Sequence, residues 1–189
     1  PVWMYAGARY ALYGRGRGTE LLGTFDPAFN AFGAWWSQWV LRHTCQDGAG
    51  VLPMHVSLTG DLDYLDNMLC SGRYPLFETL LHFPPLSTQK VNIEMDWKDY
   101  DGLDYLSEKT VSDAEQAIRQ ALVDTHAAAD VPIILIEGDA VNAAALGELF
   151  YFFELSNAIF ACACGMDPFD LPAELPVRRA AAALLGRPE

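Results

Sequence analysis

The chain alternates short apolar runs with segments whose apolar residues recur at helical spacing. Four runs have the length and the apolar, β-branched content of buried strands, at residues 19–25, 51–58, 76–83 and 131–137. Helical patterns occupy residues 2–13, 27–41, 61–71, 112–129, 140–165 and 173–185. Strands that alternate with helices favour a parallel sheet covered by helices, because each parallel connection needs a crossover. The pattern therefore predicts an α/β fold with a doubly wound sheet.

Two segments carry more detailed signals. The run at 131–137, VPIILIE, is apolar without alternation, which is typical of a central parallel strand. Ser112, with Glu115 three residues later, has the spacing of a capping box and predicts a helix that runs to about residue 129. Residues 149–166 are strongly apolar, but Glu154 and Asn157 interrupt them and the stretch is short for a membrane span. We expect a buried core helix there.

A chain of 189 residues is long enough for one domain with a well-buried core, and we take residues 1–189 as a single domain. Its net charge of −13 argues against nucleic acid and anionic membranes as partners, because phosphate groups are bound by clustered Lys and Arg. The N-terminal residues, PVWMYAGARY, lack the charged region and the long apolar run of a signal peptide. We expect a cytoplasmic protein.

Cysteine and histidine show no metal-binding pattern. The four cysteines are Cys45, Cys70, Cys162 and Cys164. Because no Cys-x-x-Cys pair occurs, we interpret them as buried, reduced thiols. The four histidines, none of which has a histidine four residues away, are His43, His55, His82 and His126. The sequence therefore predicts no metal site, and it predicts no cofactor.

Three other patterns have ordinary structural explanations. Residues 14–18, GRGRG, follow a predicted helix and precede a predicted strand, whereas a dinucleotide fingerprint follows a strand and opens a helix. We therefore expect a loop. A solvated helix face would account for Asp61, Asp63 and Asp66. A core stripe at helical spacing would account for Trp35, Trp36 and Trp39.

Several collinear segments together resemble one family, the bacterial glucose-6-phosphate isomerases. The segments are ARYALYGRGRG (8–18), PAFNAFGAWWSQ (27–38), DGAGVLP (47–53), SGRYPLFETLL (71–81), DYDGLDYLSEKT (99–110), VPIILIEGDAVNAAALGELFYFFE (131–154) and DPFDLPAELPVRRAAAALLGRP (167–188). They extend over nearly the whole chain. The resemblance implies a sugar isomerase (SIS) domain, which is a flavodoxin-like parallel sheet sandwiched between helices.

The resemblance is to the C-terminal half of the family. The N-terminal half of these isomerases carries a second domain of the same type, with the loop that holds the sugar phosphate and an arginine that stabilises the enediolate. Neither feature has a counterpart in these 189 residues. Two interpretations follow: the chain is a fragment of a longer protein, or the protein has lost or separated that half.

The resemblance places the family's catalytic residues at substituted positions. Gln38 matches a retained glutamine and is the expected substrate-binding residue. The family's base, a glutamate four residues later, falls at Arg42, whose guanidinium cannot accept a proton at neutral pH. The ring-opening histidine falls at Asp63, and the C-terminal lysine falls at Arg178. No catalytic residue is therefore expected, and His43 remains as an alternative base that would need a new geometry.

These substitutions lead to two functional hypotheses. The first is a non-catalytic domain that is related to glucose-6-phosphate isomerase and serves in carbohydrate-phosphate binding or dimerisation. The alternative is one piece of a functional isomerase, active in glycolysis and gluconeogenesis, which a missing N-terminal half completes. The expected partners are a sugar phosphate and either a second copy of the chain or the complementary half. A further hypothesis is that Arg42 of one copy and Asp63 of another form an ion pair across a dimer; the alternative is that they are two unrelated surface charges.

Overall fold

The computed structural model describes residues 1–45, 48–71, 74–84, 91–93, 99, 102–170 and 176–187. In chain order, its elements are α1 (Val2–Gly14), β1 (Thr19–Thr24), η1 (Pro27–Phe29), α2 (Asn30–Thr44), β2 (Leu52–Ser57), α3 (Leu58–Cys70), β3 (Leu76–His82), η2 (Asp104–Leu106), α4 (Val111–Ala128), β4 (Ile133–Glu137), α5 (Ala143–Ala163) and α6 (Pro176–Leu184). The predicted alternation of strands and helices is confirmed. Residues 15–18 form the predicted loop between α1 and β1.

The strands form one parallel sheet in the order β2-β1-β3-β4. Leu22 of β1 lies opposite His55 of β2 on one side and opposite Thr79 of β3 on the other. The order 2-1-3-4 is that of flavodoxin-like folds, in which the strand order reverses between β1 and β3. The predicted flavodoxin-like parallel sheet is therefore confirmed.

The position predicted for β4 is wrong. We expected a central strand, but β4 pairs with β3 alone among the described strands and lies at the edge of the sheet. Leu135 is 40% exposed, and no residue of β4 is fully buried. A continuous apolar run indicates that apolar cover lies on both faces of a strand, and it does not report how many strands flank it. The central strands are β1 and β3, whose residues are almost all buried.

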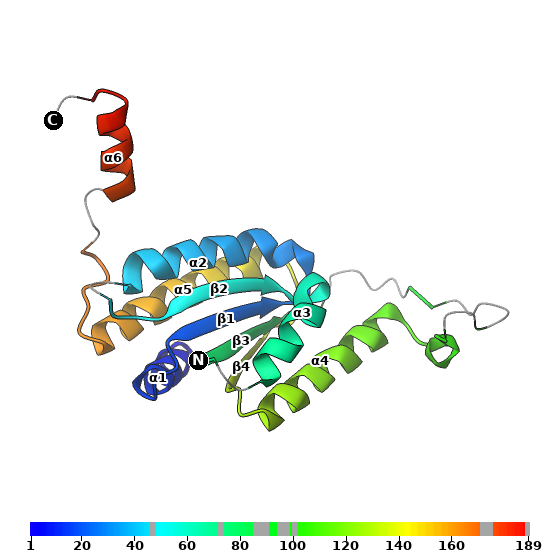
Figure 1. Cartoon of the computed structure of the whole chain (residues 1–189). Helices are drawn as coiled ribbons and strands as arrows, with labels where there is room; N and C mark the ends of the chain where they lie inside the picture. The colour runs from blue at the N-terminus through cyan, green and yellow to red at the C-terminus, as the bar shows by residue number, and fades with distance from the viewer. Residues whose placement is uncertain are drawn as a thin grey trace.

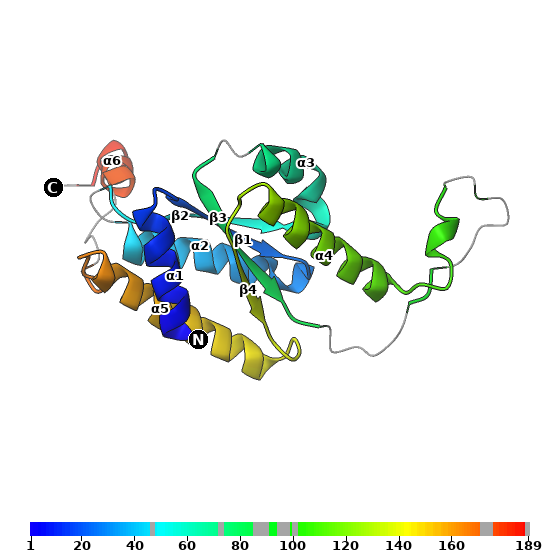
Figure 2. The ribbon, with the colours of Figure 1, turned by 90° about the horizontal axis from the view of Figure 1, so that it is seen from below.

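Helices cover both faces of the sheet, as Figures 1 and 2 show. On one face α1, α2 and α5 pack on side chains such as Leu22 and Leu81. On the other face α3 and α4 pack on Leu21 and Leu80. Consecutive residues of a strand point to opposite faces, so β1 and β3 each supply both layers of the core. The result is the predicted three-layer sandwich.

The aromatic stripe of α2 lies at the contact between α2 and α5. Trp36 is completely buried beside Phe153, as predicted for the core. Trp35 is half-buried, and its ring packs edge-on against Phe150 with 4.3 Å between ring centroids. Trp39 is half-buried and stacks on Trp35. The stripe therefore extends from the core to the rim of this contact.

We expected the helix at 149–166 to be buried in the core, but only one side of α5 is buried. Its residues Leu149, Phe153 and Phe160 are buried against α1, α2 and the sheet. Tyr151, in contrast, is 66% exposed. By length and composition, α5 is also the one helix among the described residues that could cross a membrane. Core helices share that composition, and the packing of α5 on α1 and α2 favours a core helix.

Two further predictions need correction. The N-cap of helix α4 lies two residues earlier than expected, and its capping box consists of Thr110 and Asp113. Both capping boxes fit the sequence rule, but Thr110 has the extended backbone that an N-cap needs.

The cysteines form no disulfide, but Cys70 and Cys162 are exposed, so the prediction that all four thiols are buried is wrong.

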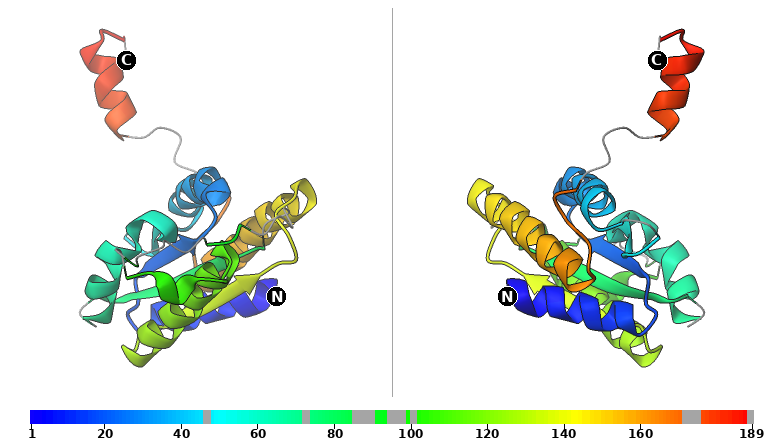
Figure 3. Two further views of the ribbon diagram at one scale, coloured as in Figure 1. Left: turned by 90° about the vertical axis from the view of Figure 1, so that its right-hand side faces the viewer. Right: turned by 90° about the vertical axis from the view of Figure 1, so that its left-hand side faces the viewer.

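Helix α6 stands away from the sandwich, as Figures 1 and 3 show. None of its residues is buried, and Leu184 is 89% exposed. Residues 171–175, which belong to the resembling segment at 167–188, lie outside the described residues.

Candidate functional site

A cavity of about 330 Å³ opens at the C-terminal edge of the sheet, where β1 and β2 end and where α3 and α4 begin. In an open parallel sheet this edge is where ligands bind. The cavity is lined by Phe25, Leu58, Thr59, Gly60, Leu62, Asp63, Val111, Ala114, Glu115 and Ile118. One of the predicted positions, Asp63, is therefore part of a concave surface.

The lining is mostly apolar, with two carboxylates. Asp63 comes from the second turn of α3, and Glu115 comes from the first turns of α4. The described lining contains no Lys or Arg. Carboxylates accept hydrogen bonds from hydroxyl groups but repel phosphate. The cavity as it stands therefore suits the hydroxyl groups and apolar face of a sugar, and a phosphate would need cations from elsewhere.

The first turn of α3 is fixed by local hydrogen bonds. Asp61 Oδ2 accepts from the backbone N–H of Ser57 at 3.1 Å, so the end of β2 is tied to the beginning of α3. Behind it, Thr24 Oγ1 lies 3.1 Å from Nε2 of His55. Burial lowers the pKa of His55, and the nearby charge of Asp61 opposes that shift only in part. The imidazole is therefore held neutral near pH 7 as part of the scaffold.

The other predicted positions do not join Asp63. Helix α2 runs back from the C-terminal end of β1, so Arg42 in its last turn lies at the opposite end of the sheet from Asp63, as Figure 1 shows. Gln38 and Arg42 are both exposed. Arg178 is exposed on α6, away from the sandwich. Within one chain, Gln38 and Arg42 therefore lie one turn apart on α2, and the structure brings neither of them to Asp63 or Arg178.

His43, the alternative base, is engaged in packing. Its Nδ1 lies 2.9 Å from the backbone carbonyl of Pro168, and its ring stacks on Trp39 with 4.0 Å between centroids. The contact with Pro168 holds the chain that follows α5 against the end of α2. His43 lies in the last turn of α2, far from the cavity at the other edge of the sheet.

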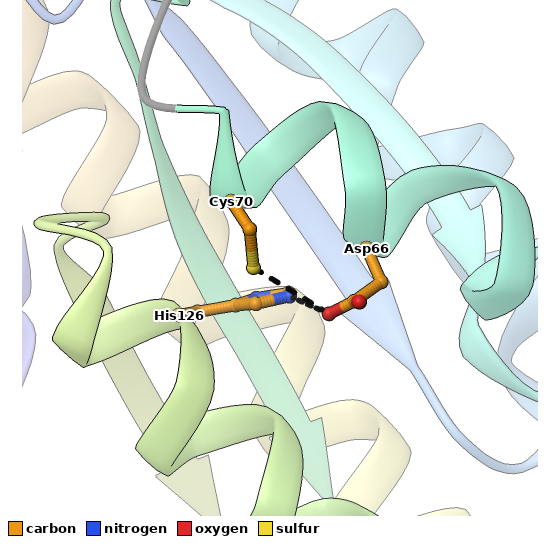
Figure 4. Close-up of side chains that lie close together, drawn as sticks. All are labelled: Asp66, Cys70 and His126. Carbon is orange, nitrogen blue, oxygen red and sulfur yellow. Dashed lines mark hydrogen bonds and ion pairs between the residues drawn. The ribbon is translucent and has the colours of Figure 1, made fainter.

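Sequence reasoning missed a second cluster, which lies where α3 and α4 end and is drawn in Figure 4. Nε2 of His126 lies 3.2 Å from Oδ1 of Asp66, and Sγ of Cys70 lies 3.6 Å from the same oxygen. On its other side, Nδ1 of His126 lies 2.7 Å from Oε2 of Glu78. His126 and Glu78 are completely buried. The sequence signal that was available is the spacing of Asp66 and Cys70, which places them one turn apart on one face of α3.

The carboxylates around His126 favour its protonated form. Burial by itself would lower the pKa of His126, but the hydrogen bonds and charges of Glu78 and Asp66 outweigh burial and raise this pKa above its ordinary value. The cluster is therefore an ordered arrangement of a carboxylate, an imidazole and a second carboxylate, with a thiol beside it.

A separate buried ion pair lies on the opposite face of the sheet. Arg9 of α1 donates from Nε to Oε2 of Glu20 at 2.7 Å, and from Nη1 to Oδ1 of Asn157 at 2.9 Å. Thr79 and Tyr5 also donate hydroxyl hydrogen bonds to Glu20. All of these residues are buried, so this network joins α1, α5 and the two central strands away from solvent.

Comparisons with known proteins support the resemblance found in the sequence. No family model matches the chain. The chain is 34% identical, over 188 residues, to the glucose-6-phosphate isomerase of Bacillus cytotoxicus, and 33% identical to those of Bacillus thuringiensis and Bacillus cereus. The alignments cover 100% of this chain but 42% of each relative.

A crystal structure of a hypothetical protein from Thermus thermophilus has the same fold. It superposes with a TM-score of 0.86 at 16% identity, and the match covers 96% of this chain and 44% of that protein. Fold and sequence comparisons therefore agree that the chain spans less than half of longer proteins. The chain matches a partial domain of the glucose-6-phosphate isomerase family.

Proposed function

We propose that this chain is a non-catalytic, carbohydrate-binding module related to glucose-6-phosphate isomerase. One observation carries the proposal: the positions of the family's base, histidine and lysine hold Arg42, Asp63 and Arg178, and these residues do not converge within one chain. Moving a proton between two carbon atoms needs a base within hydrogen-bond reach of the carbon-bound proton. The guanidinium of Arg42 stays protonated at neutral pH, so Arg42 cannot be that base.

The cavity supports the binding part of the proposal. It has the volume of a small-ligand site, and Asp63 and Glu115 supply acceptors for sugar hydroxyl groups. We expect the isolated chain to bind glucose 6-phosphate weakly, in the millimolar range, because no described cation lines the cavity to hold the phosphate. Free glucose should therefore bind at least as well as its phosphate.

Two measurements test this proposal. A coupled assay for conversion of fructose 6-phosphate should show no activity above background for the purified chain. Ligand-observed NMR titrations with glucose and glucose 6-phosphate should show binding that Glu115→Gln weakens. Asp124→Asn, on the same helix but outside the cavity lining, is the matched control and should leave binding unchanged. Turnover by the chain alone, or no binding at either ligand's solubility limit, would refute the proposal.

One observation favours the alternative, in which the chain is one piece of an active isomerase. Apolar side chains remain uncovered on the two adjacent helices α1 and α5, including Met4 at 78% and Tyr151 at 66% exposure. Exposed apolar patches mark interaction surfaces. A second copy or a complementary half would cover them. We therefore expect concentration-dependent association in sedimentation equilibrium.

The assembly hypothesis has its own assay. The N-terminal part of the Bacillus cytotoxicus relative, which this chain does not match, can be mixed with the chain before the coupled assay. Under the non-catalytic proposal the mixture stays inactive even when the two parts associate. Activity that appears only in the mixture would establish the alternative, and Tyr151→Glu should then abolish both association and activity.

A further inference from the structure

Three side chains with metal-binding atoms meet at the C-terminal ends of α3 and α4. We propose that Asp66, Cys70 and His126 form a Zn²⁺ site that joins these two helices. The site lies at the opposite end of α3 and α4 from the sugar-sized cavity, and it is independent of the proposed carbohydrate binding. The donor set of one imidazole nitrogen, one thiolate sulfur and one carboxylate oxygen is chemically suited to Zn²⁺.

Two of the three distances between donor atoms match a tetrahedral zinc site. Bond lengths of about 2.0–2.1 Å to nitrogen, 2.3 Å to sulfur and 2.0–2.2 Å to oxygen, at tetrahedral angles, place the nitrogen about 3.4 Å and the sulfur about 3.6 Å from the oxygen. Nε2 of His126 lies 3.2 Å and Sγ of Cys70 lies 3.6 Å from Oδ1 of Asp66. All three donor atoms lie within 4.8 Å of one another. The third distance, between Nε2 and Sγ, would be about 3.6 Å around a zinc ion, so binding would hold these two atoms at that separation.

Glu78 supplies the outer support that zinc-bound histidines usually have. Its Oε2 accepts from Nδ1 of His126 at 2.7 Å, and both residues are completely buried. A carboxylate on Nδ1 fixes the orientation of the ring and makes Nε2 a better metal ligand. Nε2 then faces Asp66 and Cys70, as Figure 4 shows. The most rigidly held ligand, His126, therefore comes from the core, whereas Asp66 and Cys70 come from the surface of α3.

The exposed side of the cluster gives the ion access. The side chain of Asp66 is 48% exposed and Cys70 is exposed, while the buried His126 closes the inner side. Three protein ligands leave a fourth, solvent-facing position, which water would fill. Binding releases the proton of the Cys70 thiol to solvent, since the thiolate is the ligand.

Spectroscopy with Co²⁺ and calorimetry with Zn²⁺ test the site on the whole chain. A tetrahedral Co²⁺ site with a thiolate ligand gives intense visible bands and a sulfur-to-metal charge-transfer band in the near ultraviolet. We expect one ion per chain, both spectral features, and displacement of Co²⁺ by Zn²⁺. Cys70→Ser should remove the charge-transfer band and weaken Zn²⁺ binding about 100-fold or more, since losing a ligand should cost at least as much as losing its outer support.

The controls separate this site from binding elsewhere. Cys162→Ser removes the other exposed thiol and should change neither the spectrum nor the affinity. Asp66→Asn acts at a half-exposed ligand and should also weaken binding without unfolding the protein. Glu78→Gln should weaken binding about 10- to 100-fold through the orientation of His126.

Three outcomes would overturn the proposal. The first is that the wild-type chain shows no charge-transfer band, and the second is that the band survives Cys70→Ser. The third is that Cys70→Ser and Cys162→Ser lose Zn²⁺ affinity to the same extent. Under any of these results, His126 would be a buried imidazole held by two carboxylates, with no role in binding a metal.

Discussion

The substitution Glu20→Gln tests how the buried ion pair holds α1 on the sheet. The carboxylate of Glu20 accepts from Arg9, Thr79 and Tyr5 in a space that excludes solvent. Burial raises the pKa of the Tyr5 hydroxyl well above its ordinary value, and the charge of Glu20 adds to the rise, so Tyr5 stays a donor. Glutamine keeps the shape but removes the charge that balances Arg9.

The expected loss of stability follows from the burial of both partners. Arg9 is 1% and Glu20 is 0% exposed, so no water replaces the lost partner. Breaking such a pair by removing one side costs about 3–5 kcal/mol. With a urea m-value of about 2 kcal/mol/M, the midpoint of unfolding should fall by roughly 2 M. Burial alone would lower the pKa of Arg9, but the charge of Glu20 reverses this, in agreement with a strong pair.

A double-mutant cycle isolates the pair from the packing of its side chains. Arg9→Met and Glu20→Gln should each be strongly destabilising. The double variant should lose clearly less free energy of unfolding than the sum of the two single losses. Glu137→Gln, in the half-exposed pair with Arg119, is the control and should cost less than about 1 kcal/mol. Strict additivity in the cycle, or a loss for Glu20→Gln as small as for the control, would refute the reasoning.

Three further substitutions test other parts of the structure. Gly33→Ala should destabilise the fold by about 1–3 kcal/mol, measured by urea unfolding, because a Cβ there would lie 2.1 Å from Cδ2 of His55. The folded protein lowers the pKa of His55, so the neutral imidazole contributes its full stability above the unfolded pKa of 6.5, and this contribution is lost as the pH falls below 6.5. The substitution His55→Asn should therefore make the free energy of unfolding depend less on pH between pH 7 and 5. Arg42→Ala and Asp63→Ala should each weaken self-association in sedimentation experiments, and equal association of both variants and wild type would contradict an ion pair between chains.

The layers of the fold were predictable because the hydrophobic pattern reports burial directly. The boundaries of α1, β1, β2 and β3 lie within a residue or two of those expected. The place of β4 was not predictable from its composition, since Ile and Leu fill edge and central strands alike when helices cover both faces. The strand order came from the family resemblance, because periodicity does not specify which strands pair.

The candidate site was predictable only in part. Asp63 was identified by its place in a motif, and the fold puts it in a cavity with Glu115, a residue that no sequence pattern had connected to it. The cluster around His126 was missed because its members lie far apart in the chain. Glu78 and His126 are 48 residues apart, and Asp66 and His126 are 60 residues apart. Only the packing of α3 against α4 brings these groups together.

Two buried carboxylates of the central strands constrain which residues this framework can hold. Glu20 of β1 points to the face of α1 and α5 and holds Arg9, whereas Glu78 of β3 points to the face of α3 and α4 and holds His126. Three of these residues lie in or beside the segments that carry the family resemblance, ARYALYGRGRG and SGRYPLFETLL. Each carboxylate would be left as an uncompensated buried charge if its partner changed, which penalises drift at either position. Arg42, Asp63 and Arg178 are exposed and carry no such constraint. Retained framework residues therefore report the shared fold, and they are not evidence that catalysis is retained.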